Sequence, residues 1–371
     1  MGEVITTFVG LDVHKETTAI VAAQAGREAG CFVGTVGPQL APLLKVLTHL
    51  GAPQELLVVY EAGPCGYGLA RQLRALGYGC EVVAPAKIPR RAGERIKTDR
   101  RDALQLAQWA RSGELTNVTV PDERDEAIRD LSRAREDAVR ARLKARQQLK
   151  SMLLRHGHRY TGKSSWTAAH ERFLSAVSFA HPAQDIGFVE YRQAVSESHE
   201  RVERITSALR AQAEGWRMWP ALEALMSLRG IDFVAAATLL AEIGDLRRFA
   251  HPRNLMSFLG LVPSEHSSGA TRRQGQSTKT GNGHARRILV EAAWNYRFPA
   301  RLGESITPRL EGLPQPIVDI GWKAQLRLCG RFRRLRACGL HQNKTCAAIA
   351  RELAGFIWDI GRQVSPESSL H

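Results

Sequence analysis

The sequence lacks several features that mark whole classes of protein. No run of about 18 apolar residues occurs in it, so it predicts no membrane-spanning helix. Its first residues do not place a charged segment before a long apolar one, and we therefore expect no signal peptide. No helical pattern combines a Lys/Arg face with a bulky aromatic face, which argues against an anionic membrane surface as partner.

Cysteine is scarce, and no two cysteines form a C-x-x-C pair. The six are Cys31, Cys65, Cys80, Cys329, Cys338 and Cys346. This usage is typical of a reduced cytoplasmic protein, which is the location we expect. The last three cysteines and His341 match no standard zinc-site spacing, so buried structural thiols are the favoured interpretation.

Acidic residues are outnumbered, with 37 Asp and Glu against 52 Lys and Arg, giving a net charge of +15. This balance favours a polyanionic partner, most simply nucleic acid. On charge alone, a basic protein without a nucleic-acid role remains the alternative. A chain of 371 residues with 44% apolar and 24% charged residues is ordinary for a globular protein of two or three domains.

Residues 1–118 alternate strand and helix patterns. Strands are expected at 5–13, 17–23, 31–36, 56–61 and 80–84, and helices at 39–50, 66–76 and 101–111. Short turns between the early strands predict an antiparallel meander, whereas the later strand–helix–strand units predict parallel pairing. We therefore predict a mixed α/β domain.

Residues 119–216 have a helical pattern with little strand signal. A long helix is expected at 125–159 and a second at 188–213, which would pack antiparallel as a coiled-coil hairpin. The first helix becomes purely basic toward its end, through Arg140, Arg142, Lys144 and Arg146. These cations either lie on a solvated helix face or form a surface that binds nucleic-acid phosphates, and the two interpretations are compatible.

Residues 217–371 are predicted to be mainly helical. Residues 222–244 resemble a helix–hairpin–helix, whose backbone N–H groups hold a phosphate. Asp232 stands where the second hairpin glycine is usual, and its carboxylate would repel a phosphate, so a purely structural hairpin is the alternative.

A further basic cluster, within a helical stretch around 322–335, is a second nucleic-acid face or a solvated surface. Its members are Arg327, Arg331, Arg333, Arg334 and Arg336.

Residues 260–287 are rich in serine, glycine and basic residues, which predicts a long functional loop, with a mobile surface loop as the alternative. Its cations suit a phosphate backbone. They are Arg272, Arg273, Lys279, Arg286 and Arg287. A serine here needs activation to act as a nucleophile, and residue chemistry alone does not select Ser268 over Ser264, Ser267 or Ser277.

Four acidic residues are the most informative feature of the chain. Asp12 lies inside an apolar strand pattern, Glu61 ends another, and Asp99 and Asp102 share one face at the start of a helix. A carboxylate at a buried strand end costs several kcal/mol unless it is paired. If these elements converge, the natural partner is a hard cation such as Mg²⁺, held through oxygen ligands and substrate phosphates.

Together these motifs resemble the DEDD transposases of RNA-guided (bridge-RNA) insertion sequences. Residues 10–15 (Gly-Leu-Asp-Val-His-Lys), 60–63 (Tyr-Glu-Ala-Gly) and 97–103 resemble the family's N-terminal domain, which is similar to RuvC-like resolvases of the RNase H-like class. Residues 228–231, 260–269, 279–282 and 286–287 resemble its C-terminal transposase domain. The ordered set covers nearly the whole chain.

The resemblance implies roles for individual residues. Asp12, Glu61, Asp99 and Asp102 match the acidic positions that bind a divalent metal, and Ser268 matches the nucleophile that forms a covalent phosphoserine link during strand exchange. It also implies a structured guide RNA that pairs with donor and target DNA. A composite site, with the acidic domain of one subunit meeting the serine domain of another, implies dimers or higher assemblies.

We therefore predict an RuvC-like domain at 1–118, a helical coiled-coil region at 119–216 and a C-terminal transposase domain at 217–371. The predicted function is that of an Mg²⁺-dependent serine transposase guided by RNA. Two alternatives are a resolvase-like nuclease in which water attacks, and a nucleic-acid-binding protein without enzymatic activity.

Overall fold

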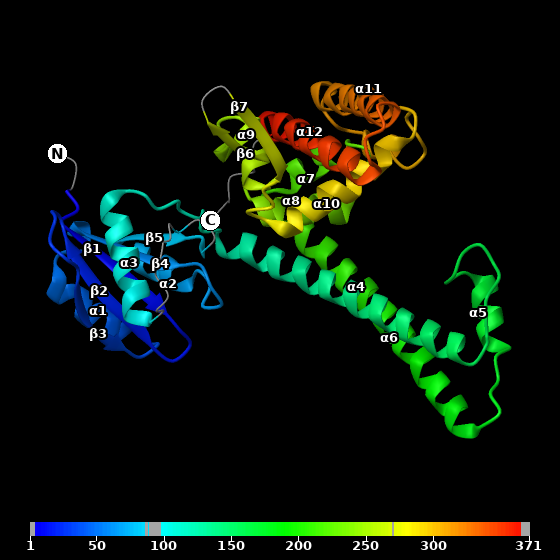
Figure 1. Ribbon diagram of the computed structural model, residues 1–371, viewed down its shortest axis with the longest axis horizontal. Helices are drawn as coiled ribbons and strands as arrows, with labels where there is room; N and C mark the ends of the chain where they lie inside the picture. Colours follow the sequence, from blue (N-terminus) through cyan, green and yellow to red (C-terminus); the bar gives the residue numbers. More distant parts are fainter. Residues whose placement is uncertain (1–3, 86–87, 89–97, 269–270, 365–371) are drawn as a thin grey trace. The chain divides into compact units, whose positions relative to one another are not determined.

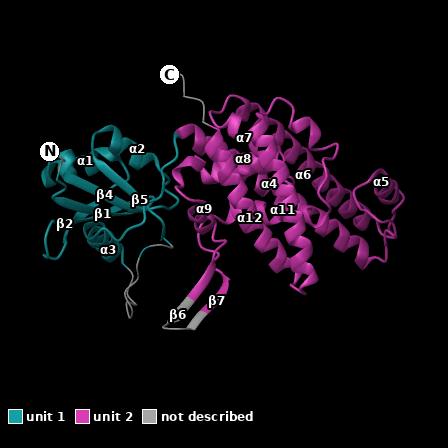
Figure 2. Ribbon diagram, turned by 90° about the horizontal axis from the view of Figure 1, so that it is seen from above, with its two compact units in different colours: residues 1–122 teal, residues 123–371 magenta. Residues whose placement is uncertain are grey.

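The computed structural model describes residues 4–85, 88, 98–268 and 271–364. The chain divides into two compact units, Met1–Asp122 and Glu123–His371 (Figure 2). Each unit has its own hydrophobic core. Among the described residues, no helix is both long enough and apolar enough to cross a membrane.

In its described residues, the first unit is a five-stranded mixed sheet with three α-helices (Figure 1). Its elements are β1 (Thr7–Val13), β2 (Thr18–Gln24), β3 (Cys31–Val36), α1 (Leu40–Leu50), β4 (Leu56–Glu61), α2 (Gly68–Ala75), β5 (Gly79–Val83) and α3 (Asp99–Ser112). The strand order is β3-β2-β1-β4-β5, with antiparallel pairing from β3 to β1 and parallel pairing from β1 to β5. The predicted meander, the parallel pairs and the mixed α/β domain are confirmed.

The two faces of this sheet bury different side chains. Because successive residues of a strand point to opposite faces, Val9 and Leu11 of β1 pack with α1 and α2. The other face is covered by α3, whose Ala103 and Ala107 lie against β1 and β2. The odd positions of β1 therefore serve the larger core, and its even positions, including Asp12, lie on the α3 face.

The second unit is mainly helical. Its helices are α4 (Glu123–Arg155), α5 (Ala168–Ser175), α6 (Pro182–Glu214), α7 (Trp219–Leu225), α8 (Phe233–Ile243), α9 (Pro252–Phe258), α10 (Gly283–Ala293), α11 (Gln315–Ala337) and α12 (Gln342–Gln363). Helices α7 to α12 surround one core, in which α8 is almost entirely buried. The predicted mainly helical C-terminal region is confirmed.

The long helices α4 and α6 pack side by side as an antiparallel hairpin, with α5 at its far end (Figure 1). Near the bundle, Ile128 of α4 and Leu209 of α6 join the core of the second unit. The expected hairpin is confirmed, although α4 ends at Arg155 and α6 begins at Pro182, earlier than expected in both cases. The division of residues 119–371 into two domains stays a prediction.

The serine-rich segment is not the long loop that its composition predicted. It forms an antiparallel β-hairpin of β6 (Pro263–Ser268) and β7 (Thr271–Ser277). Pro263 pairs with Ser277 at the base, and Ser268 pairs with Thr271. A polar segment can form such a ribbon because its two strands satisfy each other's backbone groups, so neither strand needs a buried apolar face. The loop prediction was wrong for this reason.

Candidate active site

Asp12 and Glu61 lie at the ends of neighbouring parallel strands. The pairing of β1 with β4 matches Leu11 with Tyr60, so the next residues of the two strands, Asp12 and Glu61, are neighbours at the same sheet edge. Both stand on the α3 face, because the adjacent residues Leu11 and Tyr60 point into the opposite core. Sheet register therefore brings together two carboxylates that are far apart in sequence.

Helix α3 supplies the other two carboxylates from its first turn. Thr98 caps this helix by accepting a hydrogen bond from the backbone N–H of Arg101 (3.4 Å). Asp99 and Asp102 follow directly, where negative charge favours the positive end of the helix dipole. The expected helix is confirmed, and it begins at Asp99, two residues before the predicted start at 101.

Gly10 sets the distance between α3 and β1. A Cβ atom at Gly10 would lie 2.0 Å from the carbonyl oxygen of Ala103 and 2.6 Å from the backbone nitrogen of Ala107. Only glycine permits this contact between helix and strand backbones. Because Asp12 follows two residues later on the same face, the contact also determines how closely the first turn of α3 approaches Asp12.

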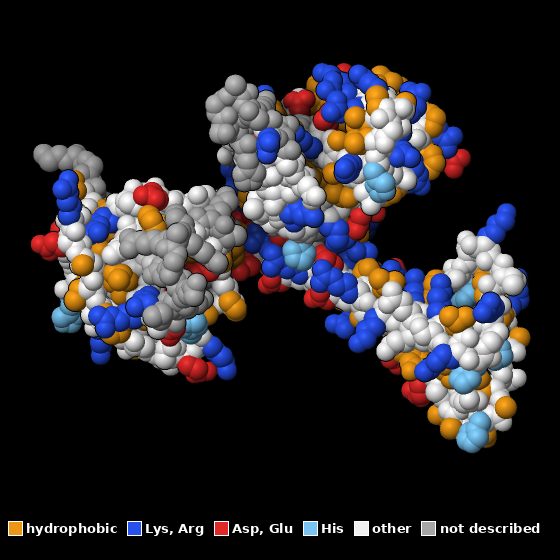
Figure 3. Space-filling view, in the orientation of Figure 1, with side chains coloured by type: hydrophobic (Ala, Val, Ile, Leu, Met, Phe, Trp, Pro, Cys, Tyr) orange, Lys and Arg blue, Asp and Glu red, His pale blue; other side chains and the backbone are white. Residues whose placement is uncertain are grey.

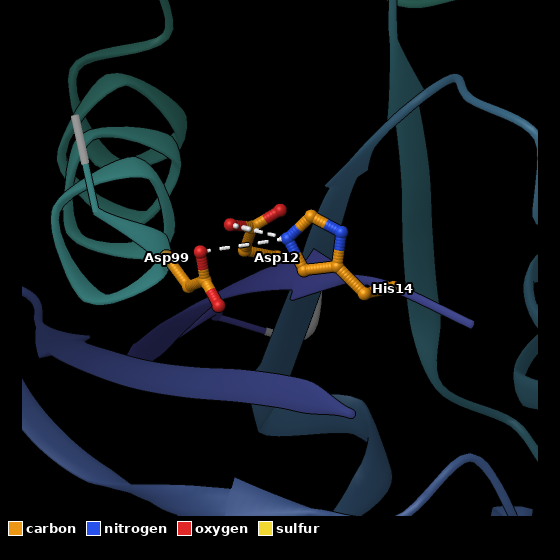
Figure 4. Close-up of side chains that lie close together, drawn as sticks. All are labelled: Asp12, His14 and Asp99. Atoms are coloured by element: carbon orange, nitrogen blue, oxygen red, sulfur yellow. Dashed lines mark ion pairs between the residues drawn. The ribbon is translucent and has the colours of Figure 1, made fainter. Parts of the chain in front are cut away.

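Asp12, His14 and Asp99 meet at this edge (Figure 4). His14 Nε2 lies 3.3 Å from Asp12 Oδ2 and 3.5 Å from Asp99 Oδ1. One ligand atom from each residue lies within 4.8 Å of the others. His14 had no predicted role of its own. Its position two residues after Asp12, on the same side of the strand, is the signal that could have identified it.

The electrostatics of the cluster favour a cation. Burial raises the pKa of the Asp12 carboxyl, His14 lowers it, and the charges of Asp102 and Asp99 raise it again, so that the pKa lies above its usual value. The Asp12 side chain is only 16% exposed, whereas that of Asp99 is 61% exposed. A partly buried carboxyl with two further carboxylates beside it, together with an imidazole, forms a donor set suited to a divalent cation such as Mg²⁺ or Mn²⁺.

The β6–β7 hairpin, which carries Ser268, is clamped at its base. Two glycines in left-handed conformations, Gly260 (φ 63°) and Gly281 (φ 82°), allow the end of α9 and the segment after β7 to touch through their backbones. A Cβ atom at Gly281 would lie 2.1 Å from the carbonyl oxygen of Phe258. Across the clamp, the Lys279 N–H donates to the carbonyl oxygen of Gly260 (3.2 Å).

A buried polar network ties this clamp to the bundle. Glu242, with 1% of its side chain exposed, accepts two hydrogen bonds from Arg133 (2.7 and 3.0 Å) and one from Asn282 (2.7 Å). The Asn282 side chain also caps α10 by accepting a hydrogen bond from the N–H of Ala285 (3.0 Å). No role was predicted for Glu242, although it is the only charged residue in the apolar helix α8.

Several predicted nucleic-acid-binding cations make contacts within the protein. Arg286 donates to the carbonyl oxygens of Leu259 (3.0 Å) and Thr280 (3.3 Å). Arg287 pairs with Glu136 (2.9 Å), which also pairs with Arg140. These three guanidinium groups therefore have structural partners, whereas Arg273, Lys279 and Lys144 are exposed. The side chain of Arg272 lies outside the described part.

The cations farther along α4 differ from one another in their surroundings. Arg142 lies 3.3 Å from Nδ1 of His199 on α6. The Arg146 guanidinium stacks over Trp166, 4.6 Å from the ring centre. This stacking explains why Arg146 is half-buried and not fully exposed to solvent. Phosphate binding by these residues stays a prediction.

Asp232 supports the structural interpretation of the helix–hairpin–helix segment. It is the N-cap of α8, and its carboxylate accepts a hydrogen bond from the N–H of Ala235 (2.8 Å). The carboxylate thus takes the place at the helix N-terminus that a phosphate would need. The other side of this hairpin is held by Arg309, which donates to the carbonyl oxygen of Ile231 (3.0 Å).

Comparison with known proteins agrees with this geometry. Residues 9–157 match a DEDD transposase model of the IS110 type, and residues 222–302 match the model described as the transposase IS116/IS110/IS902 family. A putative transposase, y4qE, of Sinorhizobium fredii is 44% identical over 98% of this chain and 90% of its own length. The transposase of insertion sequence element IS1533 from Leptospira borgpetersenii is 32% identical over 89% of this chain and 96% of its own. The chain therefore belongs to the IS110 family of insertion-sequence transposases.

Proposed function

We propose that this transposase cuts and rejoins DNA through a covalent bond between Ser268 and a DNA phosphate, with a divalent cation at the acidic cluster. The observation that carries the proposal is the convergence of Asp12, His14 and Asp99, together with the charge of Asp102, at one sheet edge. Strand register adds Glu61 as the neighbour of Asp12. These carboxylates come from three separate elements, and such convergence is typical of a metal-dependent phosphoryl-transfer site.

In the proposed step the Oγ atom of Ser268 attacks a phosphodiester. The bond from Oγ to phosphorus forms, one phosphorus–oxygen bond of the DNA breaks, and the departing DNA oxygen takes up a proton while the serine hydroxyl loses one. A hydroxyl group of a second DNA strand reverses the step and regenerates the serine. A divalent cation held by Asp12, Glu61, Asp99 and Asp102 supplies neutralisation of charge on the phosphate oxygens. The covalent bond conserves the energy of the phosphodiester, so rejoining needs no ATP.

Target choice is proposed to come from a structured guide RNA that pairs with donor and target DNA. The protein would then need mainly contacts to nucleic-acid backbones, which its net charge of +15 suits. A composite site built from the acidic unit of one subunit and the serine hairpin of another is part of this proposal, and it requires at least a dimer.

Capture of the covalent adduct tests the nucleophile. The complete native locus with its flanking DNA is expressed in cells, the lysate is denatured in SDS, and DNA still attached to the tagged protein is sequenced. We expect DNA ending at one defined junction with the wild type, and none with Ser268→Ala. Ser264→Ala, which removes a hydroxyl from the same strand, is the matched control and should keep the adduct.

Two outcomes would contradict the proposal. An adduct that persists in Ser268→Ala would assign the bond to another residue. Metal-dependent cutting without an adduct in any variant would instead favour the hydrolytic nuclease.

Asp12→Asn tests the metal assignment separately. We expect Mn²⁺ affinity, measured by calorimetry, to fall by roughly 10- to 100-fold, because the substitution removes a charged ligand from the least exposed position of the cluster. Glu16→Gln, at an exposed acidic residue of the turn that follows β1, should leave the affinity unchanged. Unchanged Mn²⁺ affinity and unchanged DNA cutting in Asp12→Asn would contradict the metal assignment. DNA binding without cutting by either protein would favour the non-enzymatic binding protein.

A further inference from the structure

A basic groove of about 1100 Å³ runs along the second unit beside the serine hairpin. Four parts of the chain line it: α9, the base of the β6–β7 hairpin, α11 and α12. The sequence of no single one of these parts predicts a groove. The base of the hairpin contributes Pro263, Gly275, Gln276 and Ser277 to its wall.

The charge of the groove is strongly one-sided. Among the lining residues that the structure describes, six are Lys or Arg, and Glu352 is the one carboxylate. The cations are Arg253, Lys279, Arg327, Arg331, Lys344 and Arg351. Figure 3 shows Lys and Arg side chains gathered over α11 on the face in view. Six positive charges against one negative charge focus a positive potential that attracts a polyanion.

The cations fall into two groups. Arg327 Nε pairs with Glu352 (2.9 Å), and Arg331 pairs with the other oxygen of the same carboxylate. Glu352 therefore holds two guanidinium groups at one wall and leaves a net positive charge there. The other four, Arg253, Lys279, Lys344 and Arg351, form no side-chain hydrogen bond or ion pair with any other part of the chain that the structure describes.

The residues that α12 contributes to the groove are regularly spaced, and those between the two cations are small. Lys344, Ala347, Ala348 and Arg351 occupy positions i, i+3, i+4 and i+7, which form one face of a helix. Two alanines between two cations leave room for a chain of phosphates to lie against the helix. Structural ion pairs do not account for this pattern, because both α12 cations lack an acidic partner among the described residues.

The distance from the groove to Ser268 along β6 can be compared with the length of a short DNA segment. Pro263 at the base of β6 lines the groove, and Ser268 is five residues farther along the same strand. At about 3.3 Å per residue the separation along the strand is about 17 Å. That length corresponds to about five nucleotides of one DNA strand at about 3.4 Å each.

We propose that this groove binds the backbone of the DNA on one side of the phosphate that Ser268 attacks. The inference rests on the proposed function for its link to Ser268, but the binding of DNA to the groove can be tested without strand exchange. Lys344 and Arg351 contact phosphates, and Glu352 orients Arg327 and Arg331 toward the same backbone.

The test measures binding of the full-length protein to a fluorescent random-sequence 40-base-pair DNA duplex in EDTA, over a range of NaCl concentrations. We expect the variant Lys344→Ala/Arg351→Ala to bind about 10-fold or more weakly at 100 mM salt. The slope of log affinity against log salt should fall by about 1.8, since each neutralised duplex phosphate contributes about 0.9. The matched control is Arg201→Ala/Arg204→Ala, which removes two exposed cations from α6 and should change neither quantity.

A second variant tests the groove without removing a cation. Ala347→Glu places a carboxylate and added volume between the two cations, and we expect it to weaken DNA binding to a similar extent. Ala211→Glu, on an exposed face of α6, is its control. Circular dichroism of each variant separates loss of folding from loss of binding.

Three results would overturn the proposal. The first is wild-type affinity and slope in both groove variants, and the second is no measurable DNA binding by the wild type. The third is loss of binding to an RNA duplex of the same sequence with DNA binding unchanged, which would assign the groove to RNA. None of these depends on the adduct experiment, so failure of the serine mechanism and failure of the groove are distinguishable.

Discussion

Replacement of Gly10 by alanine is expected to reduce transposition at least 100-fold, although Gly10 has no side chain that could take part in the reaction. The added Cβ would lie 2.0 Å from the carbonyl oxygen of Ala103, and neither atom can rotate away, because one is fixed directly to the Cα atom and the other is part of the helix backbone. Helix α3 must therefore move off β1, and its first turn carries Asp99 and Asp102 with it. A displacement of about 1 Å in a catalytic group can cost about 100-fold in rate.

The same variant should lose Mn²⁺ affinity, measured by calorimetry. Gly68→Ala is the matched control, because no atom lies within 4 Å of a Cβ at that position of α2. We expect this control to bind Mn²⁺ and support transposition as the wild type does. If Gly10→Ala also kept wild-type Mn²⁺ affinity with a folded first unit, the approach of α3 to β1 would not determine the geometry of the acidic cluster.

Replacement of Glu242 by glutamine is expected to lower the free energy of unfolding of the second unit by about 1–3 kcal/mol at pH 7. The Glu242 carboxylate is buried, so loss of its charge weakens the hydrogen bonds that it accepts, whereas Arg133, with 46% of its side chain exposed, stays partly solvated. Here the remaining charge is that of Arg133, and Asn282 loses an acceptor. Six of the seven tryptophans lie in the second unit, so the fluorescence change in urea measures its unfolding.

The pH dependence of this effect has a definite sign. Burial raises the pKa of the Glu242 carboxyl, but the hydrogen bonds from Arg133 and Asn282 lower it by more, so its pKa in the folded protein lies below 4.5. The stability that ionised Glu242 contributes is complete above about pH 4.5 and is lost as the pH falls through the lower, folded-state pKa. The difference between wild type and Glu242→Gln should therefore shrink in acid.

Glu223→Gln is the control for this measurement. Glu223 is an exposed carboxylate on α7 in the same bundle, and its replacement should change the free energy of unfolding by less than about 0.5 kcal/mol. A Glu242→Gln variant as stable as this control would show that the network with Arg133 and Asn282 contributes little to the fold.

The structural consequence of losing Glu242 should extend to the serine hairpin. Asn282 joins the network to the start of α10, and the preceding residues form the clamp at Gly260 and Gly281. The network thus links the rigid helix α8 to the segment that orients β7. Functional residues on a hairpin need such support, because the hairpin itself has no hydrophobic face to fix its direction.

Local sequence was sufficient for much of the first unit. Runs of apolar residues predicted β1 and β4, and Asp99 and Asp102, three positions apart, marked the start of α3. The interpretation of Asp12 and Glu61 as strand-end carboxylates needed only the rule that an unpaired charge is costly in a core. These features depend on residues close together in the chain, so they could be predicted without a structure.

The sequence by itself therefore determined the mixed sheet, the helical hairpin, the family and the identity of the candidate acidic ligands. Only the tertiary structure decided which of them meet, because strand register depends on residues about fifty positions apart and the contact at Gly10 on residues about ninety positions apart. It also decided that Arg287 pairs with Glu136, while Lys344 and Arg351 have no such partner among the described residues. A basic side chain has the same local pattern in both situations, and its partner is chosen by packing between distant elements.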